Sequence, residues 1–273
     1  MGRLLSAGLV CLAFAFFSVA RAEHSWTDSS GRPYHWAGAG NEFTLNLGYN
    51  VSAKWVEVLE EARSDWNRST VLDTARVDGG TRPKTCKPTA GQVEVCSERY
   101  GYNGWLGIAQ IWISSGHITQ AITKVNDSYF NTTKYNTPAW RLFVMCQEIG
   151  HTFGLDHQDE NFNNANLGSC MDYTSDPISN QHPDDHDYAQ LMAIYTSHND
   201  DSTTSASQAS APNLPPPAMS EIDFEGPGQW GKLVRSTRGD RLQRYELDFG
   251  GGHKIFTFVI WANEEDRGRG KPR

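Results

Sequence analysis

Residues 146–157 read C-Q-E-I-G-H-T-F-G-L-D-H, and this stretch decides how the rest of the chain is interpreted. If it forms an α-helix, Gln147 and His151 lie four positions apart, on one face and one turn above each other. Glu148 is the next residue along, so its carboxylate lies beside whatever this pair holds. The stretch therefore presents two candidate metal ligands and a neighbouring acid from one side of a helix.

A third candidate ligand follows where this helix is expected to end. Gly154 comes three residues after His151, and glycine readily takes the positive φ angle that ends a helix sharply. The chain can then turn back and bring His157 to the same point. A catalytic zinc ion requires three protein ligands, an open position for water and a carboxylate to accept the proton of that water. The spacing predicts such a site.

The segment resembles the zinc-binding signature HExxHxxGxxH of the metzincin peptidases, with Gln147 at the position of the first histidine. The remaining signature positions match: Glu148, His151, Gly154 and His157. Metzincins also carry a methionine turn beneath the metal, and S-C-M-D-Y at residues 169–173 resembles the form found in their astacin and serralysin branches. The resemblance covers about residues 35–197. It implies an α+β fold, in which a twisted mixed sheet and two long helices form a cleft between an upper and a lower subdomain.

The same resemblance implies a function, that of a secreted zinc-dependent endopeptidase acting on proteins or peptides. The implied metal ligands are Gln147, His151 and His157. Glu148 would serve as the general base. Met171 would pack beneath the metal, and Tyr173, two residues later, would be a fifth ligand or a donor that stabilises the transition state.

Gln147 is the departure from the family pattern, and it leaves alternatives open. Its neutral amide can reach a metal, but an amide oxygen is a harder and weaker ligand for zinc than an imidazole. The protein is then either a working variant peptidase, a catalytically disabled one that binds proteins or peptides, or another kind of metal hydrolase. Glu148 favours the working peptidase, because a disabled site has no chemical use for the general base.

The first 22 residues predict a secretory signal peptide. A short apolar run from 9 to 19 follows Arg3, and residues 20–22 read A-R-A, a typical cleavage site. The run is too short to span a bilayer, so we expect an exported, monomeric protein with no membrane attachment after cleavage. The 32 acidic residues outnumber the 24 basic ones, which argues against nucleic acid or an anionic membrane as a partner.

Four of the five cysteines lie outside the predicted signal peptide, and an even number in an oxidising compartment favours two disulfides. Three pairings are possible. We favour Cys86–Cys96, which closes a short loop, together with Cys146–Cys170. The second bridge follows from the resemblance, since it would join the metal motif to the methionine turn. The competing interpretation makes Cys146 a thiolate ligand in place of the missing histidine, although it lies about 100° away round the helix.

The apolar stretch at 104–114 predicts a strand rich in Ile and Trp. In metzincins, a strand at this distance before the zinc helix forms the sheet edge above the cleft and pairs with extended substrate. The resemblance thus assigns substrate pairing to four consecutive residues: Gly107, Ile108, Ala109 and Gln110. The competing interpretation is a buried strand that touches no substrate.

Other elements follow from hydrophobic periodicity and from turn and cap signals. We expect strands at 43–47 and 71–77, helices at 55–66 and from 137 through the metal motif, a closing helix that starts near 182, and loops at 79–98 and 158–168.

The composition changes near residue 200, which defines the expected domain organisation. Residues 23–199 would form the metzincin-like domain, and 200–219, rich in Ser, Thr, Ala and Pro, would be a linker. Alternating segments within 220–273 predict a small β-rich module with a basic tail. With about 55 residues and no cysteine, such a module would be marginally stable alone.

Overall fold

A computed structural model describes residues 24–37, 43–162, 164–196, 216–221, 226–237 and 241–267. The predicted signal peptide and most of the predicted linker lie outside these residues. Within them, no helix combines the length and the apolar character that crossing a membrane requires.

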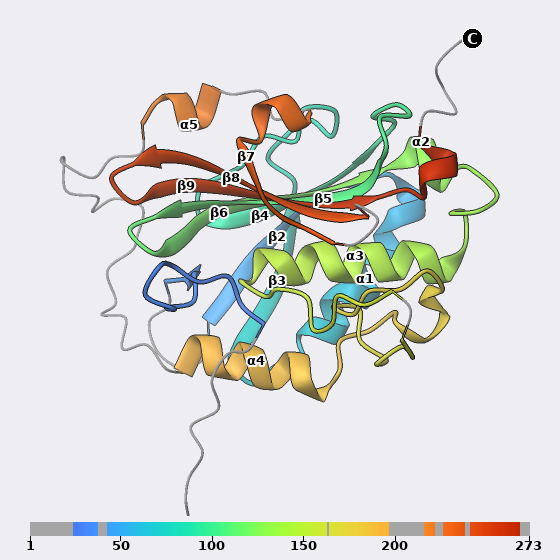
Figure 1. Ribbon diagram of the computed structural model, residues 1–273, viewed down its shortest axis with the longest axis horizontal. Helices are drawn as coiled ribbons and strands as arrows, with labels where there is room; N and C mark the ends of the chain where they lie inside the picture. The colour runs from blue at the N-terminus through green and yellow to red at the C-terminus, as the bar shows by residue number, and fades with distance from the viewer. Residues whose placement is uncertain are drawn as a thin grey trace, which may run out of the picture.

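The described residues form one large mixed sheet with helices packed on it (Figure 1). The strands are β1 (His35–Trp36), β2 (Phe43–Asn50), β3 (Leu72–Asp78), β4 (Gln92–Glu98), β5 (Trp105–Ser114), β6 (His117–Asn126), β7 (Lys232–Ser236), β8 (Leu242–Gly250) and β9 (His253–Trp261). Their order is β3-β2-β4-β6-β5-β9-β8-β7, and β1 pairs with β6. The pairs among β2, β3, β4 and β6 are parallel, whereas β5, β9, β8 and β7 pair antiparallel in succession. The expected α+β class with a mixed sheet is confirmed.

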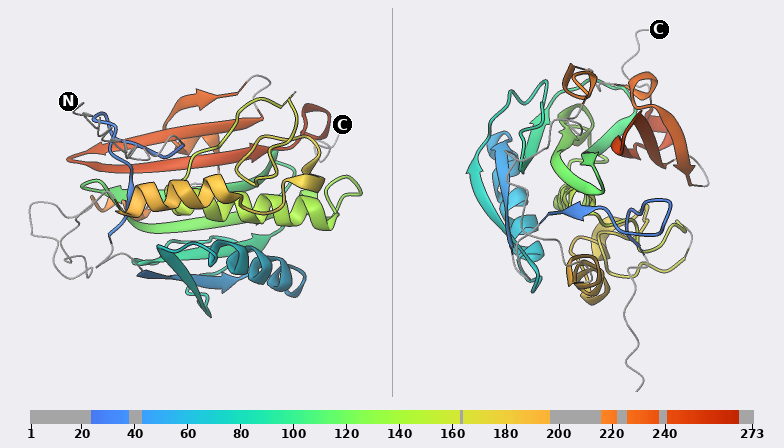
Figure 2. Two further views of the ribbon diagram at one scale, coloured as in Figure 1. Left: turned by 90° about the horizontal axis from the view of Figure 1, so that it is seen from below. Right: turned by 90° about the vertical axis from the view of Figure 1, so that its left-hand side faces the viewer.

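Three longer helices lie on the same side of this sheet (Figures 1 and 2). They are α1 (Ala53–Trp66), α3 (Pro138–Thr152) and α4 (Asp185–Thr196); α2 (Asp127–Phe130) and α5 (Ala218–Glu221) are single turns. The apolar stripe expected on α1 is the buried one, and the indole nitrogen of Trp66 donates to the Cys146 carbonyl oxygen at 3.1 Å. This contact joins α1 to the start of the metal motif on α3.

Helix α3 begins and ends where the sequence indicates. The Thr137 hydroxyl accepts a hydrogen bond from the Trp140 amide at 3.2 Å, and Pro138 occupies the first turn, where its missing N–H costs nothing. At the other end Gly154 has a φ of 96°, and a Cβ there would lie 2.4 Å from the Tyr34 carbonyl oxygen. Both the backbone angle and the close approach require glycine, so the turn toward His157 is fixed by this residue.

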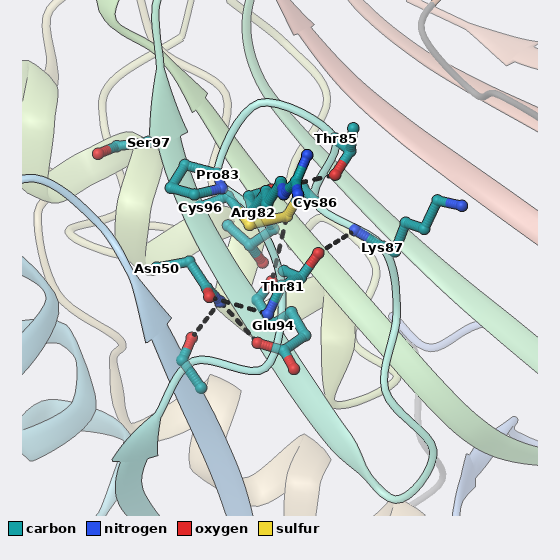
Figure 3. The surroundings of a disulfide bond; sticks show 12 residues. Asn50, Thr81, Arg82, Pro83, Thr85, Cys86, Lys87, Glu94, Cys96 and Ser97 are labelled. Atoms are coloured by element: carbon teal, nitrogen blue, oxygen red, sulfur yellow. Dashed lines mark hydrogen bonds between the residues drawn. A yellow bond between two sulfur atoms is a disulfide. The ribbon is translucent and has the colours of Figure 1, made fainter.

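The prediction of a loop at 79–98 is wrong for its second half. Residues 92–98 form β4, which lies between β2 and β6 with its side chains buried on both faces. Glu94 disguised the strand, because a carboxylate is rarely found inside a sheet. It is buried here because it accepts a hydrogen bond from the Asn50 amide at 2.6 Å (Figure 3). It also accepts from the Gln92 amide at 2.6 Å and from the Gly80 backbone N–H at 3.2 Å. The sequence also gave no prediction for β6, the partner of β4.

Both favoured disulfides are present. Cys86 is bonded to Cys96 beside the Glu94 network (Figure 3), and Cys146 is bonded to Cys170. The second bridge ties the residue before Gln147 to the residue before Met171. Cys146 is therefore not a candidate thiolate ligand.

The C-terminal strands do not form a separate module, contrary to expectation. They continue the main sheet, because β9 pairs antiparallel with β5 along its whole length (Figure 1). The residues expected at a free edge, Gly107 to Gln110, lie opposite Ile260, Val259, Phe258 and Thr257. Strand β9 is apolar on both faces, and such a strand buries more surface inside a sheet than in an isolated hairpin.

Candidate metal centre

The two histidines of the motif converge, as their spacing predicts. The Nε2 atoms of His151 and His157 lie 3.0 Å apart, and the two rings meet edge to face with centroids 4.4 Å apart. Two nitrogens bound at about 2.0–2.1 Å to one tetrahedral zinc ion would lie about 3.3 Å apart. The separation in this protein is close to that value.

The tautomer of His151 follows from its second nitrogen. His151 Nδ1 is 2.9 Å from the Leu155 carbonyl oxygen, which can only accept, so Nδ1 carries the proton. Nε2 then has a free lone pair that points at His157. Burial lowers the pKa of His151 well below its usual range and keeps this ring neutral. A neutral imidazole with its other nitrogen bonded to a carbonyl is the usual state of a metal-binding histidine.

His157 is oriented by two groups on its Nδ1 side. The Tyr173 hydroxyl lies 2.8 Å from Nδ1, and the nearer Asp156 carboxylate oxygen lies 3.4 Å from it. In the metal-free chain, Tyr173 donates to Nδ1 and His157 donates from Nε2 to His151. A metal ion would take the place of that single Nε2 proton, and Nδ1–H would then donate to Tyr173 or Asp156.

Tyr173 therefore does not lie where the resemblance predicts. Its hydroxyl contacts the nitrogen of His157 that faces away from His151, whereas a fifth ligand or a transition-state donor would lie on the Nε2 side. The Phe162 ring stacks on Tyr173, with centroids 5.1 Å apart, and holds it in this place. In this conformation the Tyr173 hydroxyl orients the His157 ring from its Nδ1 side.

The amide of Gln147 is fixed with its oxygen free. Its Nε2 donates to the Cys170 carbonyl oxygen at 2.8 Å, while its Oε1 is buried without a hydrogen-bond partner. Because the Cys146–Cys170 disulfide holds that carbonyl beside the start of the motif, the amide cannot easily turn over. A buried acceptor without a donor is costly, and a cation would satisfy it. The donor set thus fits a metal ion: two imidazole nitrogens and one unpartnered amide oxygen.

Glu148 is the second buried polar side chain of the site that lacks a hydrogen-bond partner. Both carboxylate oxygens are buried without a hydrogen-bond partner, and burial raises the pKa of Glu148 well above its usual range. The side chain lies against Gly107 of β5, where a Cβ would come within 2.7 Å of Glu148 Oε1 and 2.6 Å of Val144 Cγ1. Gly107 therefore makes room for the acid, which is a different role from the substrate pairing expected of it.

We expect the substitution Gly107→Ala to destabilise the chain by about 1–3 kcal/mol, because neither the strand backbone nor helix α3 can retreat from the added methyl group. Urea unfolding of the metal-free protein measures this. Gly226→Ala is the matched control, since a Cβ at Gly226 meets no atom within 4 Å, and it should change stability by less than about 0.5 kcal/mol. Equal effects of the two substitutions would contradict the contact with Glu148.

The segment expected to form the methionine turn packs against helix α3. Met171 is fully buried, with its sulfur against Gly150 of α3. The Ser169 hydroxyl accepts from the Met171 amide at 2.8 Å and donates to the Asp187 carboxylate on α4 at 2.6 Å. The turn is thus held between α3 and α4, and its position depends on a buried acid.

Asp187 should make stability depend on pH. Burial raises its pKa to about 7, so in the folded chain it keeps a proton that the unfolded chain loses above its ordinary value of 3.8. Stability from this group therefore falls by about 1.4 kcal/mol per pH unit between about pH 4 and 7. The variant Asp187→Asn keeps an acceptor for Ser169. Its free energy of unfolding should rise relative to that of the parent chain over this pH range, and the difference should then level off. Asp185→Asn, at an exposed position of the same helix, should show no such slope.

The site is closed, in contrast to the open cleft that the resemblance implies. Gln147, Glu148 and His151 are each 0% exposed. The Phe258 ring of β9 stacks on His151, with centroids 4.7 Å apart and an interplanar angle of 25°. The Trp26 ring also stacks on the Phe258 ring, with centroids 3.9 Å apart. An N-terminal segment and a C-terminal strand therefore cover the candidate ligands together.

Strand β7 adds a charged contact beside His157. Arg235 binds the Asp156 carboxylate at 2.8 Å through Nη1 and the Glu160 carboxylate at 2.5 Å through Nη2. Asp156, His157 and Glu160 themselves form a group whose ligand atoms lie within 4.8 Å of one another. Arg235 already pairs with both carboxylates of this group, so the better fit for a cation is on the Nε2 side of His157.

Sequence patterns gave no sign of Trp26, Phe258 or Arg235 at the site. Phe258 belongs to an apolar run that reads only as a strand, and Trp26 lies in a polar segment without periodicity. The places of Trp26 and Phe258 depend on contacts between residues more than 100 positions apart, and that of Arg235 on contacts across more than 70 positions. Neither hydrophobic periodicity nor motif spacing in a single sequence indicates such contacts.

No protein-family model and no curated protein matches this sequence. Among solved structures, the chain is similar to high choriolytic enzyme 1, a hatching enzyme zinc-protease from the medaka fish Oryzias latipes. The two share 11% sequence identity with a TM-score of 0.36, and the match covers 64% of this chain and 99% of that chain. The chemistry of the site rests on the contacts described above.

Proposed function

We propose that this chain is a variant zinc-dependent endopeptidase that holds its metal with His151, His157 and the amide oxygen of Gln147. The observation that carries this proposal is the pair of imidazole Nε2 atoms 3.0 Å apart. The helix that carries His151 also carries two buried groups without hydrogen-bond partners, Gln147 Oε1 and the Glu148 carboxylate. Structural histidine pairs do not require two further unsatisfied groups beside them. A bound cation would satisfy the two imidazole nitrogens and the amide oxygen at once, and it would leave Glu148 free to act as the base.

A zinc ion would supply a Lewis acid that polarises a peptide carbonyl and makes water acidic enough to lose a proton near neutral pH. Glu148 takes that proton and delivers it to the leaving amine. Its buried, partner-free carboxyl suits this task, because a raised pKa lets it hold the proton between the two steps. Tyr173 and Asp156 hold the His157 ring in place from behind.

The proposed substrates are extended segments of proteins or peptides, and the proposed compartment is extracellular. Two disulfides support an oxidising compartment.

Zinc titration of the full-length chain tests the proposal. We expect about one equivalent, removed by chelator and abolished in His151→Ala and in His157→Ala. His182→Ala is the control, because the side chain of this histidine pairs with Asp65 at 2.7 Å and is 48% exposed. A chain that binds no zinc, or that binds it equally well without His151 and His157, would overturn the assignment.

A further inference from the structure

The outer edge of β5 is fully used by the chain itself. Strand β9 pairs with it antiparallel from Trp105, opposite Trp261, to Ser114, opposite His253. The side chains add to this pairing, since the Gln110 amide donates to the Thr257 hydroxyl at 2.9 Å. An extended peptide could add to this side of β5 only if β9 were absent.

Resting on the proposed function, we propose that β9 is an intramolecular occupant of the peptide-binding edge of β5, and that the metal centre is latent until β9 leaves this edge. The occupant is the segment 253–261, which runs in an extended conformation past the metal ligands. The full-length chain as it folds is therefore the closed form of the enzyme.

Phe258 connects the pairing of β9 with β5 to the closure of the metal site. It lies opposite Ala109, within the segment expected to bind substrate, and its ring covers His151. Trp26 packs on the same ring and is bonded through its backbone N–H to the Gly154 carbonyl oxygen at 3.0 Å. A substrate carbonyl approaching His151 would meet the Phe258 ring first.

Arg235 ties strand β7 to the segment around His157. Its two ion pairs join β7 to Asp156 and Glu160, on either side of His157 in the sequence. Its side chain is 45% exposed, so this contact is open to water and salt. The buried apolar side chains of β9 make its release from β5 rare. A single substitution of Arg235 can weaken the closure without leaving a cavity in the hydrophobic core.

Two variants of the full-length chain test the closure in opposite directions. In Arg235→Gln the ion pairs are lost. In Ser114→Cys/His253→Cys a disulfide would join β5 to β9 at residues directly opposite each other, five positions from Phe258 and about 17 Å away along the strand. Arg76→Gln is the control for the first variant, because it removes a comparably exposed ion pair with Glu60 far from β9. Ser114→Cys alone is the control for the second.

The first readout does not depend on catalysis. Metal-free protein is treated with diethyl pyrocarbonate, and modification of His151 and His157 is followed by mass spectrometry, with His182 as the exposed internal reference. We expect both site histidines to react at least 10-fold more slowly than His182 in the parent chain. Arg235→Gln should raise their rate at least 3-fold, the oxidised double-cysteine variant should lower it, and both controls should match the parent chain.

The second readout is cleavage of an unstructured peptide by the zinc-loaded proteins, which should rise in Arg235→Gln and be lost in the oxidised double-cysteine variant. Equal histidine reactivity in all variants, or full cleavage by the cross-linked chain, would overturn the closure. If the double-cysteine variant does not fold, Arg235→Gln with its control decides alone. If no variant binds zinc, the proposed function fails, while the histidine reactivities still decide whether β9 closes the site.

Discussion

Replacing Glu148 with Gln is expected to lower chelator-sensitive peptide hydrolysis by about 10²–10⁴-fold while zinc binding stays near one equivalent. The glutamine has almost the same shape but cannot accept a proton, so only general-base catalysis is removed. Hydrolysis is best measured in the Arg235→Gln background, in which access to the site is expected to be greater. Unchanged hydrolysis there would show that Glu148 is not the base.

The same substitution should stabilise the metal-free protein, and the sign of its pH dependence is fixed. The pKa of Glu148 is raised in the folded chain by burial, so above about pH 4.5 the unfolded chain loses a proton that the folded chain keeps. The parent chain therefore loses about 1.4 kcal/mol per pH unit relative to Glu148→Gln, up to the folded pKa.

Urea unfolding at pH 4 and at pH 8 measures this difference. The two proteins should be nearly equally stable at pH 4, and the variant should be the more stable at pH 8. Glu57→Gln, at an exposed position of α1, is the control and should give no widening gap. A variant that is less stable than the parent at both pH values would mean that Glu148 is ionised and paired in the folded chain.

The substitution Gln147→His is expected to tighten zinc binding by at least about 10–100-fold. Imidazole is a better zinc ligand than an amide oxygen, and even changes behind a ligand commonly alter affinity by this factor. The site can receive the new ring, because its Nδ1–H can replace the amide as donor to the Cys170 carbonyl oxygen and leave Nε2 for the metal. Competition with a chromogenic zinc chelator measures the affinity.

Gln147→Leu is the counterpart of this experiment. It fills a similar volume without an oxygen, so it should bind zinc more weakly than the parent chain. If leucine and glutamine bind zinc equally well, the free Oε1 does not contact the metal, and the two histidines alone hold it. If histidine gives no gain over glutamine, the ring cannot reach the ion from this position.

Much of the candidate centre could be predicted from short-range spacing. The shared helix face of Gln147 and His151, the glycine turn at Gly154 and the return of His157 all arise within 11 residues, where helix geometry alone sets the positions. The Cys146–Cys170 bridge and the place of Met171 required the family resemblance as well, because they join segments that no local pattern connects.

The role of Tyr173 could not be settled in the same way. The resemblance makes Tyr173 a fifth ligand or a transition-state donor, but no pattern in the sequence indicates that its hydroxyl contacts the Nδ1 atom of His157. That choice depends on the Phe162 ring and on the rotation of the imidazole, which are properties of the packed structure.

The sequence by itself determined the candidate metal motif and the two long helices, because each follows from a periodicity or spacing that the chain carries locally, and the α+β class followed from the family resemblance that this motif carries. Only the tertiary structure decided that β9 lies on β5 and that Phe258 covers His151. An apolar strand shows the same pattern whether it pairs only within its own hairpin or also with a strand more than 130 residues away. Which edge it joins is decided by the area that it buries there, and that area exists only once the rest of the sheet has formed.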